Sequence, residues 1–490
     1  MGHRDRIGRG REPLRLVSGG PAGHTRAARA ALAAHVARHA ATHPLLNALV
    51  QPRPVEAARE AALGLSGLLA GVTVSVKECF PVRGLRTTLG IPGRGVVADL
   101  ADADIVSRLR AAGAIVVGKA NVPQAMYLHE TDNPVWGRTN HPLSPARSPG
   151  GSSGGDAALV AAGVVALAVG TDLAGSLRQP AHACGIATLM PRSTVLGEGG
   201  AVDTLPHLTA VRPRAGFFAR CVEDLAVALV AVVPGAILSA PPPRRVGWWD
   251  TSGPIPPSAA IRRGVAEAVA RLQAAGIEMV PLDGALAEEA AWLHLAILAA
   301  DGGADIRTLF GGVRPMPGVR RLIALAALPR RLRPTLAAIA RLAGRRLEAR
   351  GLLVTGPRNA AGRGNLVARR ADLARRFAAL LGDCEAVVCP VSALPALRHG
   401  TAARLFLAAA PCFAANLLDL AAGAVPVTSV RPDEERGRPW SFDPVLRAAA
   451  ATDRGSAGLP VGVQVIAGPA GGEATVLAVM RLLEGLPSQR

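Results

Sequence analysis

The chain has 490 residues, of which 50% are hydrophobic and 19% charged, a balance that supports a large buried core and excludes a disordered protein. Its formal net charge of +19 raises the question of nucleic-acid binding, but arginine is spread along the whole chain and only 3% of residues are aromatic. We therefore expect no nucleic-acid partner. Because no repeat or Gly/Ser linker divides the chain, we expect a single domain over residues 26–490.

The N-terminal residues 1–25 are rich in glycine and arginine, which predicts a disordered basic tail. Beyond this tail, helical periodicity alternates with short runs of β-branched residues. In chain order we predict a helix at 27–50, a strand at 71–76, a helix at 104–112, a strand at 114–117, helices at 156–167 and 261–275, and strands at 278–280 and 385–388. This alternation indicates an α/β fold in which helices cover both faces of a sheet.

The cysteine pattern and the lengths of the apolar runs indicate where in the cell the protein is located. Six cysteines without a CxxC pair are typical of buried free thiols in a reducing environment. No apolar segment follows the basic N-terminus, so a signal peptide is not expected, and the longest apolar runs are too short to span a bilayer, which takes about 20 residues. We expect a cytoplasmic protein.

Residues 141–176 contain two Gly/Ser-rich loops joined by a segment of small residues. The first loop reads GGSSGG and carries Ser152 and Ser153, and the second reads GTDLAGS and ends at Ser176. Glycine-rich backbone approaches a ligand closely and presents several N–H donors to one point. One such loop is usually only a flexible connection, but a pair of them predicts a catalytic site.

Two other motifs in the sequence do not fit their usual structural context. The segment at 150–154 matches the G-x-S-x-G nucleophile elbow, which needs a hydrophobic strand before it, and here three prolines precede it. The segment at 113–119 matches G-x-x-x-x-G-K, but Ala120 replaces the residue that would hold magnesium and the segment is a predicted strand. We expect neither chemistry.

The two loops, together with VSVKECF at 74–80, resemble the signature of the amidase signature family, and the resemblance extends from about residue 71 to residue 469, with the signature core at about 71–230. It implies a large mixed β-sheet covered by helices on both faces. It also implies a catalytic triad of Lys77, Ser152 and Ser176, without metal or organic cofactor. The implied oxyanion hole consists of the backbone N–H groups of Leu173, Ala174, Gly175 and Ser176. Ser153, Asp172 and Arg178 are the implied supporting residues, and Asp172 is expected to hold the second loop together with Arg178.

The segments KECF at 77–80, NVPQAM at 121–126 and the stretch 416–430 resemble the fatty-acid amide hydrolase branch of that family. This resemblance implies a small-molecule amide substrate with an apolar or fatty acyl group, and Met126 and Tyr127 as residues that line its site. Two alternatives remain open: a glutamine-hydrolysing amidotransferase A-type subunit, and a catalytically silent homologue that acts as a binding protein.

Amide cleavage needs an activated nucleophile, donors for the oxyanion and a proton for the leaving amine. In the expected relay, neutral Lys77 accepts the proton of Ser152, Ser152 accepts that of Ser176, and Ser176 attacks the carbonyl carbon. Lys77 and Lys119 are the two lysines of a chain whose other basic residues are arginines. We interpret Lys119 as structural.

The segment 319–350 carries nine arginines and one acidic residue among regularly spaced leucines and isoleucines. The simpler interpretation is an ordinary pair of surface helices. The alternative is a peripheral membrane contact beside the substrate entrance, which is where the resemblance places membrane-binding helices. A homodimer also remains open.

Overall fold

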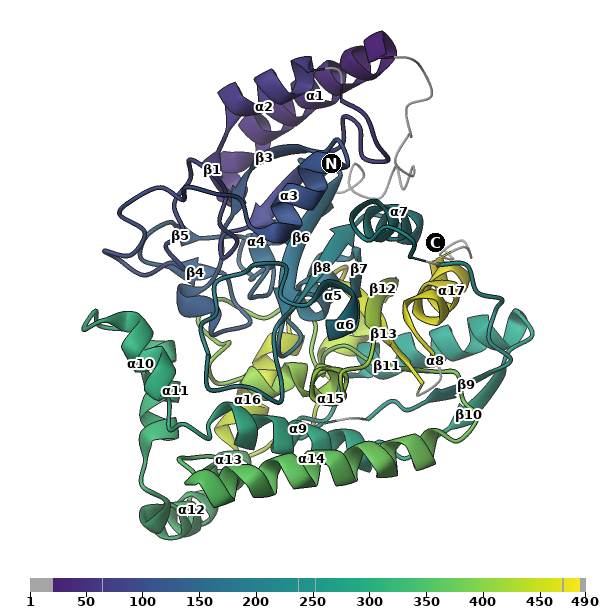
Figure 1. Cartoon of the computed structure of the whole chain (residues 1–490). Helices are drawn as coiled ribbons and strands as arrows, with labels where there is room; N and C mark the ends of the chain where they lie inside the picture. Colours follow the sequence, from purple (N-terminus) through teal and green to yellow (C-terminus); the bar gives the residue numbers. More distant parts are fainter. Residues whose placement is uncertain (1–20, 64, 237, 252, 469–470, 485–490) are drawn as a thin grey trace.

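The computed structural model of the chain describes residues 21–63, 65–236, 238–251, 253–468 and 471–484 (Figure 1). Its strands are β1 (Leu49–Pro52), β2 (Thr73–Lys77), β3 (Ile115–Ala120), β4 (Asp132–Asn133), β5 (Gly137–Arg138), β6 (Leu167–Asp172), β7 (Ala187–Met190), β8 (Arg214–Ala219), β9 (Arg245–Trp248), β10 (Glu278–Pro281), β11 (Ala386–Pro390), β12 (Ala422–Ser429) and β13 (Pro460–Ala467). Its longer helices are α1 (Pro21–Leu46), α2 (Pro54–Ala62), α3 (Asp104–Ala111), α4 (Gly154–Ala161), α5 (Arg178–Cys184), α7 (Val222–Val232), α8 (Ala259–Ala274), α9 (Ala285–Leu298), α10 (Ala304–Phe310), α11 (Pro317–Ala327), α12 (Arg333–Leu342), α13 (Arg346–Val354), α14 (Ala360–Leu381), α15 (Phe413–Leu418), α16 (Pro444–Asp453) and α17 (Glu473–Glu484).

Eleven of these strands form one mixed sheet in the order β1-β3-β2-β6-β8-β7-β12-β13-β11-β9-β10. Strand β2 runs parallel to β3 and β6, and β9 runs parallel to β10 and β11. The other neighbours in the sheet are antiparallel. The predicted large mixed sheet is therefore confirmed.

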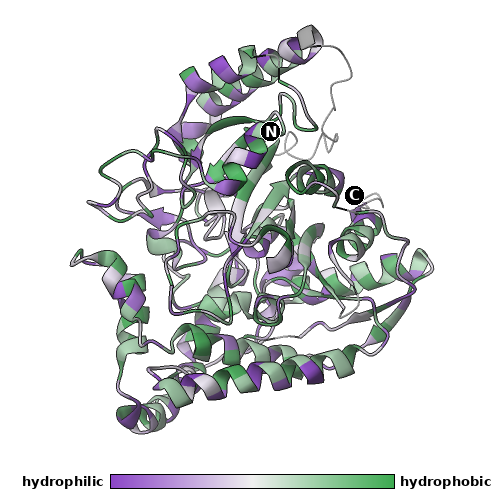
Figure 2. Cartoon of the chain, in the orientation of Figure 1, coloured by the Kyte–Doolittle hydropathy of each residue, from purple (hydrophilic) through white to green (hydrophobic). Residues whose placement is uncertain are grey.

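Helices cover both faces of the sheet, as predicted (Figure 1). One core cluster packs apolar side chains of α3, α7, α8 and α17 against the sheet, and a second cluster packs those of α1, α4, α9 and α14. The outer helices α1 and α14 carry both hydrophilic and hydrophobic residues (Figure 2), as expected of helices with one buried side. All six cysteines are buried and unpaired.

Most predicted elements correspond to observed ones, and two predictions are wrong in their bounds. The helix predicted at 156–167 is α4, which ends at Ala161; Gly163 has a φ of 68°, and Leu167 already begins strand β6. The helix predicted at 27–50 is α1, which begins at Pro21 and ends at Leu46. Residues 21–25 of the predicted tail therefore belong to a helix, while residues 1–20 lie outside the described part of the chain.

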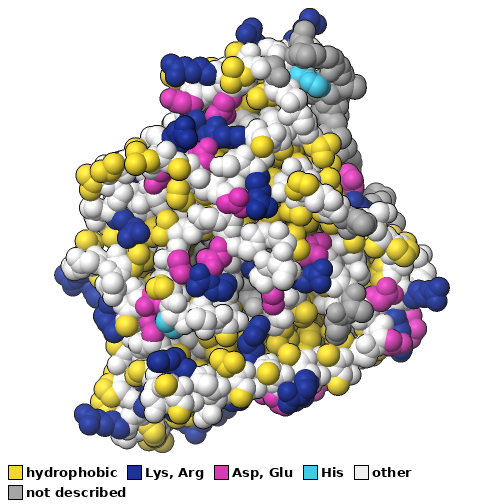
Figure 3. Space-filling view, in the orientation of Figure 1, with side chains coloured by type: hydrophobic (Ala, Val, Ile, Leu, Met, Phe, Trp, Pro, Cys, Tyr) yellow, Lys and Arg dark blue, Asp and Glu magenta, His cyan; other side chains and the backbone are white. Residues whose placement is uncertain are grey.

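The basic segment 319–350 forms parts of three helices rather than a pair. Helix α11 ends at Ala327, the short 3₁₀ turn Arg330–Leu332 follows, and α12 and α13 complete the segment. On the face shown in Figure 3, arginine side chains are scattered and often lie beside acidic ones. In the part of the chain that the structure describes, no helix has the length and apolar character that crossing a membrane requires.

Candidate active site

The sheet topology brings Lys77 beside the second Gly/Ser-rich loop. Strands β2 and β6 are parallel neighbours in which Val76 lies opposite Val169, so both strands deliver their carboxyl ends to the same edge of the sheet. Lys77 is the last residue of β2, and β6 ends at Asp172, directly before the loop that carries Ser176. Sites in α/β sheets form at such edges.

Lys77 is buried and contacts two hydroxyl groups. Its Nζ lies 2.7 Å from Ser152 Oγ and 2.8 Å from Thr171 Oγ1. Burial lowers the pKa of Lys77 because the charged form loses its water. A neutral amine at hydrogen-bond distance from a serine hydroxyl can accept its proton.

The two Gly/Ser-rich loops are joined by hydrogen bonds. The peptide bond between Gly151 and Ser152 is cis, and Gly151 N–H donates to Gln179 Oε1 at 3.1 Å. Ser153 N–H donates to the carbonyl of Ser176 at 3.3 Å, and Ser153 Oγ donates to the Thr171 carbonyl at 3.3 Å. Ser153 therefore holds the two loops together, while Ser152 and Ser176 both line the same cavity.

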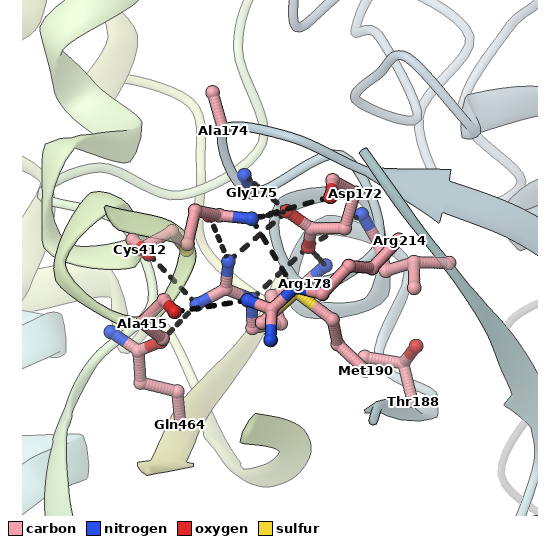
Figure 4. A network of polar contacts seen from close by, with 12 residues as sticks. Asp172, Ala174, Gly175, Arg178, Thr188, Met190, Arg214, Cys412, Ala415 and Gln464 are labelled. Carbon is pink, nitrogen blue, oxygen red and sulfur yellow. Dashed lines mark hydrogen bonds and ion pairs between the residues drawn. The ribbon is translucent and has the colours of Figure 1, made fainter. Parts of the chain in front are cut away.

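Asp172 and Arg178 form a buried ion pair beneath the second loop (Figure 4). Arg178 Nε donates to Asp172 Oδ2 at 3.1 Å, and its guanidinium also donates to the carbonyl of Cys412 and to Gln464 Oε1. Although burial alone would raise the pKa of Asp172, the Arg178 guanidinium and the hydrogen bonds to the carboxylate hold that pKa well below its usual range. The Asp172 carboxylate also accepts from the N–H groups of Gly175 and Leu177, so the pair is tied to the backbone of this loop.

The N–H groups assigned to the oxyanion hole differ in whether they already donate a hydrogen bond within the protein. Gly175 N–H donates to Asp172 Oδ1 at 2.7 Å, so it is not free to bind an oxyanion, and the assignment of Gly175 as a donor is wrong in this structure. Among the described residues, the N–H groups of Leu173, Ala174 and Ser176 donate to no other group, so they remain available. Gly175 instead allows the backbone to turn, because its φ of 92° is a conformation that favours glycine, whereas the φ of Ala174 is not positive.

His129 fixes the other side of the same peptide unit. Its Nε2 donates to the Ala174 carbonyl at 2.8 Å, and its ring stacks on Phe406 with 5.0 Å between ring centroids. Burial lowers the pKa of His129 to about 4, so the imidazole is neutral at pH 7. The peptide between Ala174 and Gly175 is thus held at its carbonyl by His129 and at its N–H by Asp172.

A second carboxyl group lies below the lysine. Asp156 is buried in α4 and accepts a hydrogen bond from Ser75 Oγ at 2.8 Å. Burial raises the pKa of Asp156 to about 7, since the charged form is poorly solvated there. Protonation of Asp156 removes one of the two carboxylate charges that favour the charged form of Lys77, and the other, on Asp172, is paired with Arg178.

A cavity of about 300 Å³ opens from Ser152 and Ser176. Met126 and Tyr127, which the resemblance implied as lining residues, lie in its wall, and the pKa of Tyr127 is raised by burial to about 12. Most of the remaining wall is apolar and includes Leu128, Leu173, Leu205, Trp292, Leu295, Leu298, Leu322, Leu325, Leu352, Phe406 and Leu407. Ser152 and Ser176 therefore face a largely apolar space.

One group of described residues has the spacing of metal ligands. His207 Nδ1 lies 2.6 Å from Asp305 Oδ2 and 3.6 Å from Asp301 Oδ2. The carboxylates already have hydrogen-bond donors within the protein. Asp301 accepts from the backbone N–H groups of Gly303 and Asp305, and Asp305 accepts from His207. The group therefore has a structural explanation without an ion.

Three residues at the site were not identified from the sequence. Thr171 belongs to the GTDLAGS segment and Asp156 directly follows GGSSGG, so both could have been found as polar residues near the predicted serines. His129 gave no such signal, because it lies far from the loops in sequence and the fold alone brings it to Ala174.

Comparison with known proteins places the chain in a family. The family model described as Amidase matches residues 30–477. The chain is 34% identical over 435 residues to fatty-acid amide hydrolase 1 of Sus scrofa, covering 82% of this chain and 73% of that protein. It is 28% identical to fatty acid amide hydrolase 1 of Caenorhabditis elegans, over 93% and 83% of the two chains. A solved structure of a fatty acid amide hydrolase superposes with a TM-score of 0.79 at 19% identity, covering 95% of this chain and 87% of the other.

The chain thus has the mixed α/β fold of amidase structures, and it belongs to the amidase family. It is a hydrolase that acts on amide C–N bonds. Among its relatives it is similar to the fatty-acid amide hydrolases.

Proposed function

We propose that the chain hydrolyses carboxamides with an apolar or fatty acyl group through a Lys77–Ser152–Ser176 triad and an acyl-enzyme. The observation that carries the proposal is the contact of buried Lys77 with Ser152, which lines a largely apolar cavity together with Ser176. Burial favours neutral Lys77, and apolar walls favour a substrate that loses contact with water on binding.

In the proposed reaction Lys77 accepts the proton of Ser152, which accepts that of Ser176 while Ser176 Oγ attacks the amide carbon. The N–H groups of Leu173, Ala174 and Ser176 stabilise the oxyanion. Ser152 then returns a proton to the departing nitrogen, which leaves as amine or ammonia. Water hydrolyses the acyl-enzyme through the same relay and gives the carboxylate.

We further propose that the segment 319–350 makes a peripheral contact with membranes. Leu332, Ile339 and Leu342 are 47%, 57% and 90% exposed, and several arginines close to them in sequence are exposed as well: Arg330, Arg331, Arg341, Arg345 and Arg346. Helices α11 and α13 of the same segment line the cavity. An apolar substrate that is dissolved in a bilayer would then have a short path to the site.

Activity against straight-chain primary amides of graded acyl length tests the proposed substrate class. We expect kcat/KM to rise with acyl length from two carbons to about twelve, because each buried methylene adds about 0.8 kcal/mol. A preference for acetamide or for glutamine over long-chain amides would contradict the proposal, and activity on glutamine that depends on a co-purified protein would favour the amidotransferase alternative.

A further inference from the structure

Helices α11 and α13 form part of the cavity wall, and the ends of both contact a buried arginine that forms no ion pair with any described residue. Arg333 is the first residue of α12 and is 2% exposed. Among the residues that the structure describes, no carboxylate lies within ion-pair distance of it. A charge that has so little contact with water has to be compensated by other polar groups.

The compensation comes entirely from the ends of two other helices. Arg333 Nε donates to Leu328 O at 2.9 Å, and Nη2 donates to Leu325 O at 2.5 Å and to Ala326 O at 3.0 Å, all at the end of α11. Nη1 donates to Leu352 O at 3.2 Å, near the end of α13, and to Thr355 Oγ1 at 3.0 Å, just beyond it.

These contacts match both the charge and the shape of the side chain. A guanidinium has five N–H groups, and each of them has one acceptor here. The last carbonyls of a helix have no partner within the helix and carry the negative end of its dipole, which a cation stabilises. Lysine has a single donor atom and cannot reproduce this fork.

Gly356, which has no side chain, leaves the space that the guanidinium of Arg333 occupies. Gly356 has a φ of 107°, and a Cβ atom at this residue would overlap Cζ and Nε of Arg333. Any other residue at position 356 would displace the arginine. Gly356 thus belongs to the same arrangement.

Four of the five acceptor residues also line the cavity: Leu325 and Ala326 on one side, Leu352 and Thr355 on the other. Helix α11 is packed into the core by Val319 and Ile323, whereas α12 buries only Arg333 and Ala337 and α13 buries only Ala349. The guanidinium of Arg333 hydrogen-bonds to the ends of both α11 and α13 and so links these two helices. An ion pair between Arg321 and Glu348 (2.7 Å) links the same two helices, but both of its side chains are partly exposed.

We propose that Arg333 is a positioning residue that sets the width of the outer cavity and thereby the accepted acyl-chain length. This inference rests on the proposed function for its substrate. Arg333 does not touch the reacting atoms, so it acts on the binding of long chains and not on the chemical step. Short amides, which occupy only the catalytic end, are insensitive to it.

The test compares Arg333→Lys with wild type and with Arg369→Lys, which makes the same change at an exposed site on α14. For dodecanamide we expect KM of Arg333→Lys to rise about tenfold or more with kcat within about threefold, while kcat/KM for propanamide stays within about threefold. Gly356→Ala should reproduce this pattern with Arg333 intact. Thr355→Val removes one acceptor and should give a smaller effect in the same direction, which keeps the test available if Arg333→Lys does not fold.

Binding of dodecanoate, followed by the fluorescence of Trp292 in the cavity wall, gives a readout that needs no catalysis. We expect its Kd to rise about tenfold or more in Arg333→Lys and to stay unchanged in Arg369→Lys. If wild type cleaves no amide, the proposed function fails, but this affinity still decides the role of Arg333. Equal losses of kcat/KM for short and long amides would overturn the inference. So would an unchanged dodecanoate affinity in Arg333→Lys, Gly356→Ala and Thr355→Val.

Discussion

The substitution Lys77→Arg distinguishes two roles of Lys77: a general base that accepts the proton of Ser152, and a cation that only holds Ser152 in place. The guanidinium keeps the positive charge and can still donate to Ser152 Oγ and Thr171 Oγ1, the two groups that Lys77 contacts at 2.7 and 2.8 Å. It does not deprotonate in proteins, so it cannot accept the proton of Ser152. Loss of a general base lowers kcat by about 10²–10⁴, and we expect a fall of about a thousandfold, equivalent to about 4 kcal/mol of transition-state stabilisation.

The assay is kcat for a long-chain primary amide across pH, together with the melting temperature of each variant. In wild type, activity should fall as the pH is lowered through the depressed pKa of Lys77, because the protonated amine cannot act as a base. In Lys77→Arg this dependence should vanish with the activity.

The second lysine offers a matched control. Lys119 is also buried, and it donates to the carbonyl of Arg86 and to Thr87 Oγ1, away from the two serines. Lys119→Arg should change the melting temperature and leave kcat within about threefold of wild type, because it removes no base. More than a tenth of wild-type activity in Lys77→Arg, at an unchanged melting temperature, would refute the reasoning.

Three further predictions concern the loop, the buried carboxyl group and the basic segment. Ala174→Gly should leave activity within about threefold, since Ala174 is not at positive φ and glycine relieves no strain there; Gly175→Ala should lose about tenfold or more, because its φ is 92° and the new Cβ would lie 2.9 Å from Cys412 Cβ. Assays at matched melting temperature check both, and a large loss in Ala174→Gly would show that its methyl group is needed. The raised pKa of Asp156, from 3.8 to about 7, means that the folded state holds a proton which the unfolded chain releases, so stability is lost as the pH rises through this interval. Asp156→Asn removes this dependence, and its melting temperature relative to wild type should rise between pH 4 and pH 8; a constant difference would contradict the assignment. The segment 319–350 should bind anionic vesicles in sedimentation assays, with about 1 kcal/mol per arginine at the surface and weaker binding in high salt. If binding is unchanged after four exposed arginines are replaced by glutamine, the segment is an ordinary protein surface and not a membrane contact.

The sequence predicted the fold class and the two Gly/Ser-rich loops beside Lys77 because these depend on local patterns. The β-branched run before Lys77 predicts β2, and the Gly/Ser-rich segments around Ser152 and Ser176 predict close backbone approach. Strand β6 was missed because its residues LAVGTD are small and continue the composition of the helix before them. The resulting overlong helix shows that composition without a turn signal does not locate a boundary.

The parts of the site that could not be predicted depend on contacts between distant segments. The use of Gly175 N–H by Asp172 is a matter of loop geometry, and the hydrogen bond of His129 to the Ala174 carbonyl joins residues 45 apart in the chain. Likewise, Arg333 is one of nine arginines in a basic segment, and only its burial among helix ends distinguishes it from its exposed neighbours.

The central claim is that Ser176 is the nucleophile, and a fluorophosphonate probe tests it most directly. Such a probe phosphonylates an activated serine, and peptide mapping by mass spectrometry locates the adduct. We expect the adduct on Ser176, with labelling abolished in Ser176→Ala and strongly slowed in Lys77→Arg. An adduct on Ser152 or Ser153, or no labelling of folded wild-type protein, would contradict the account.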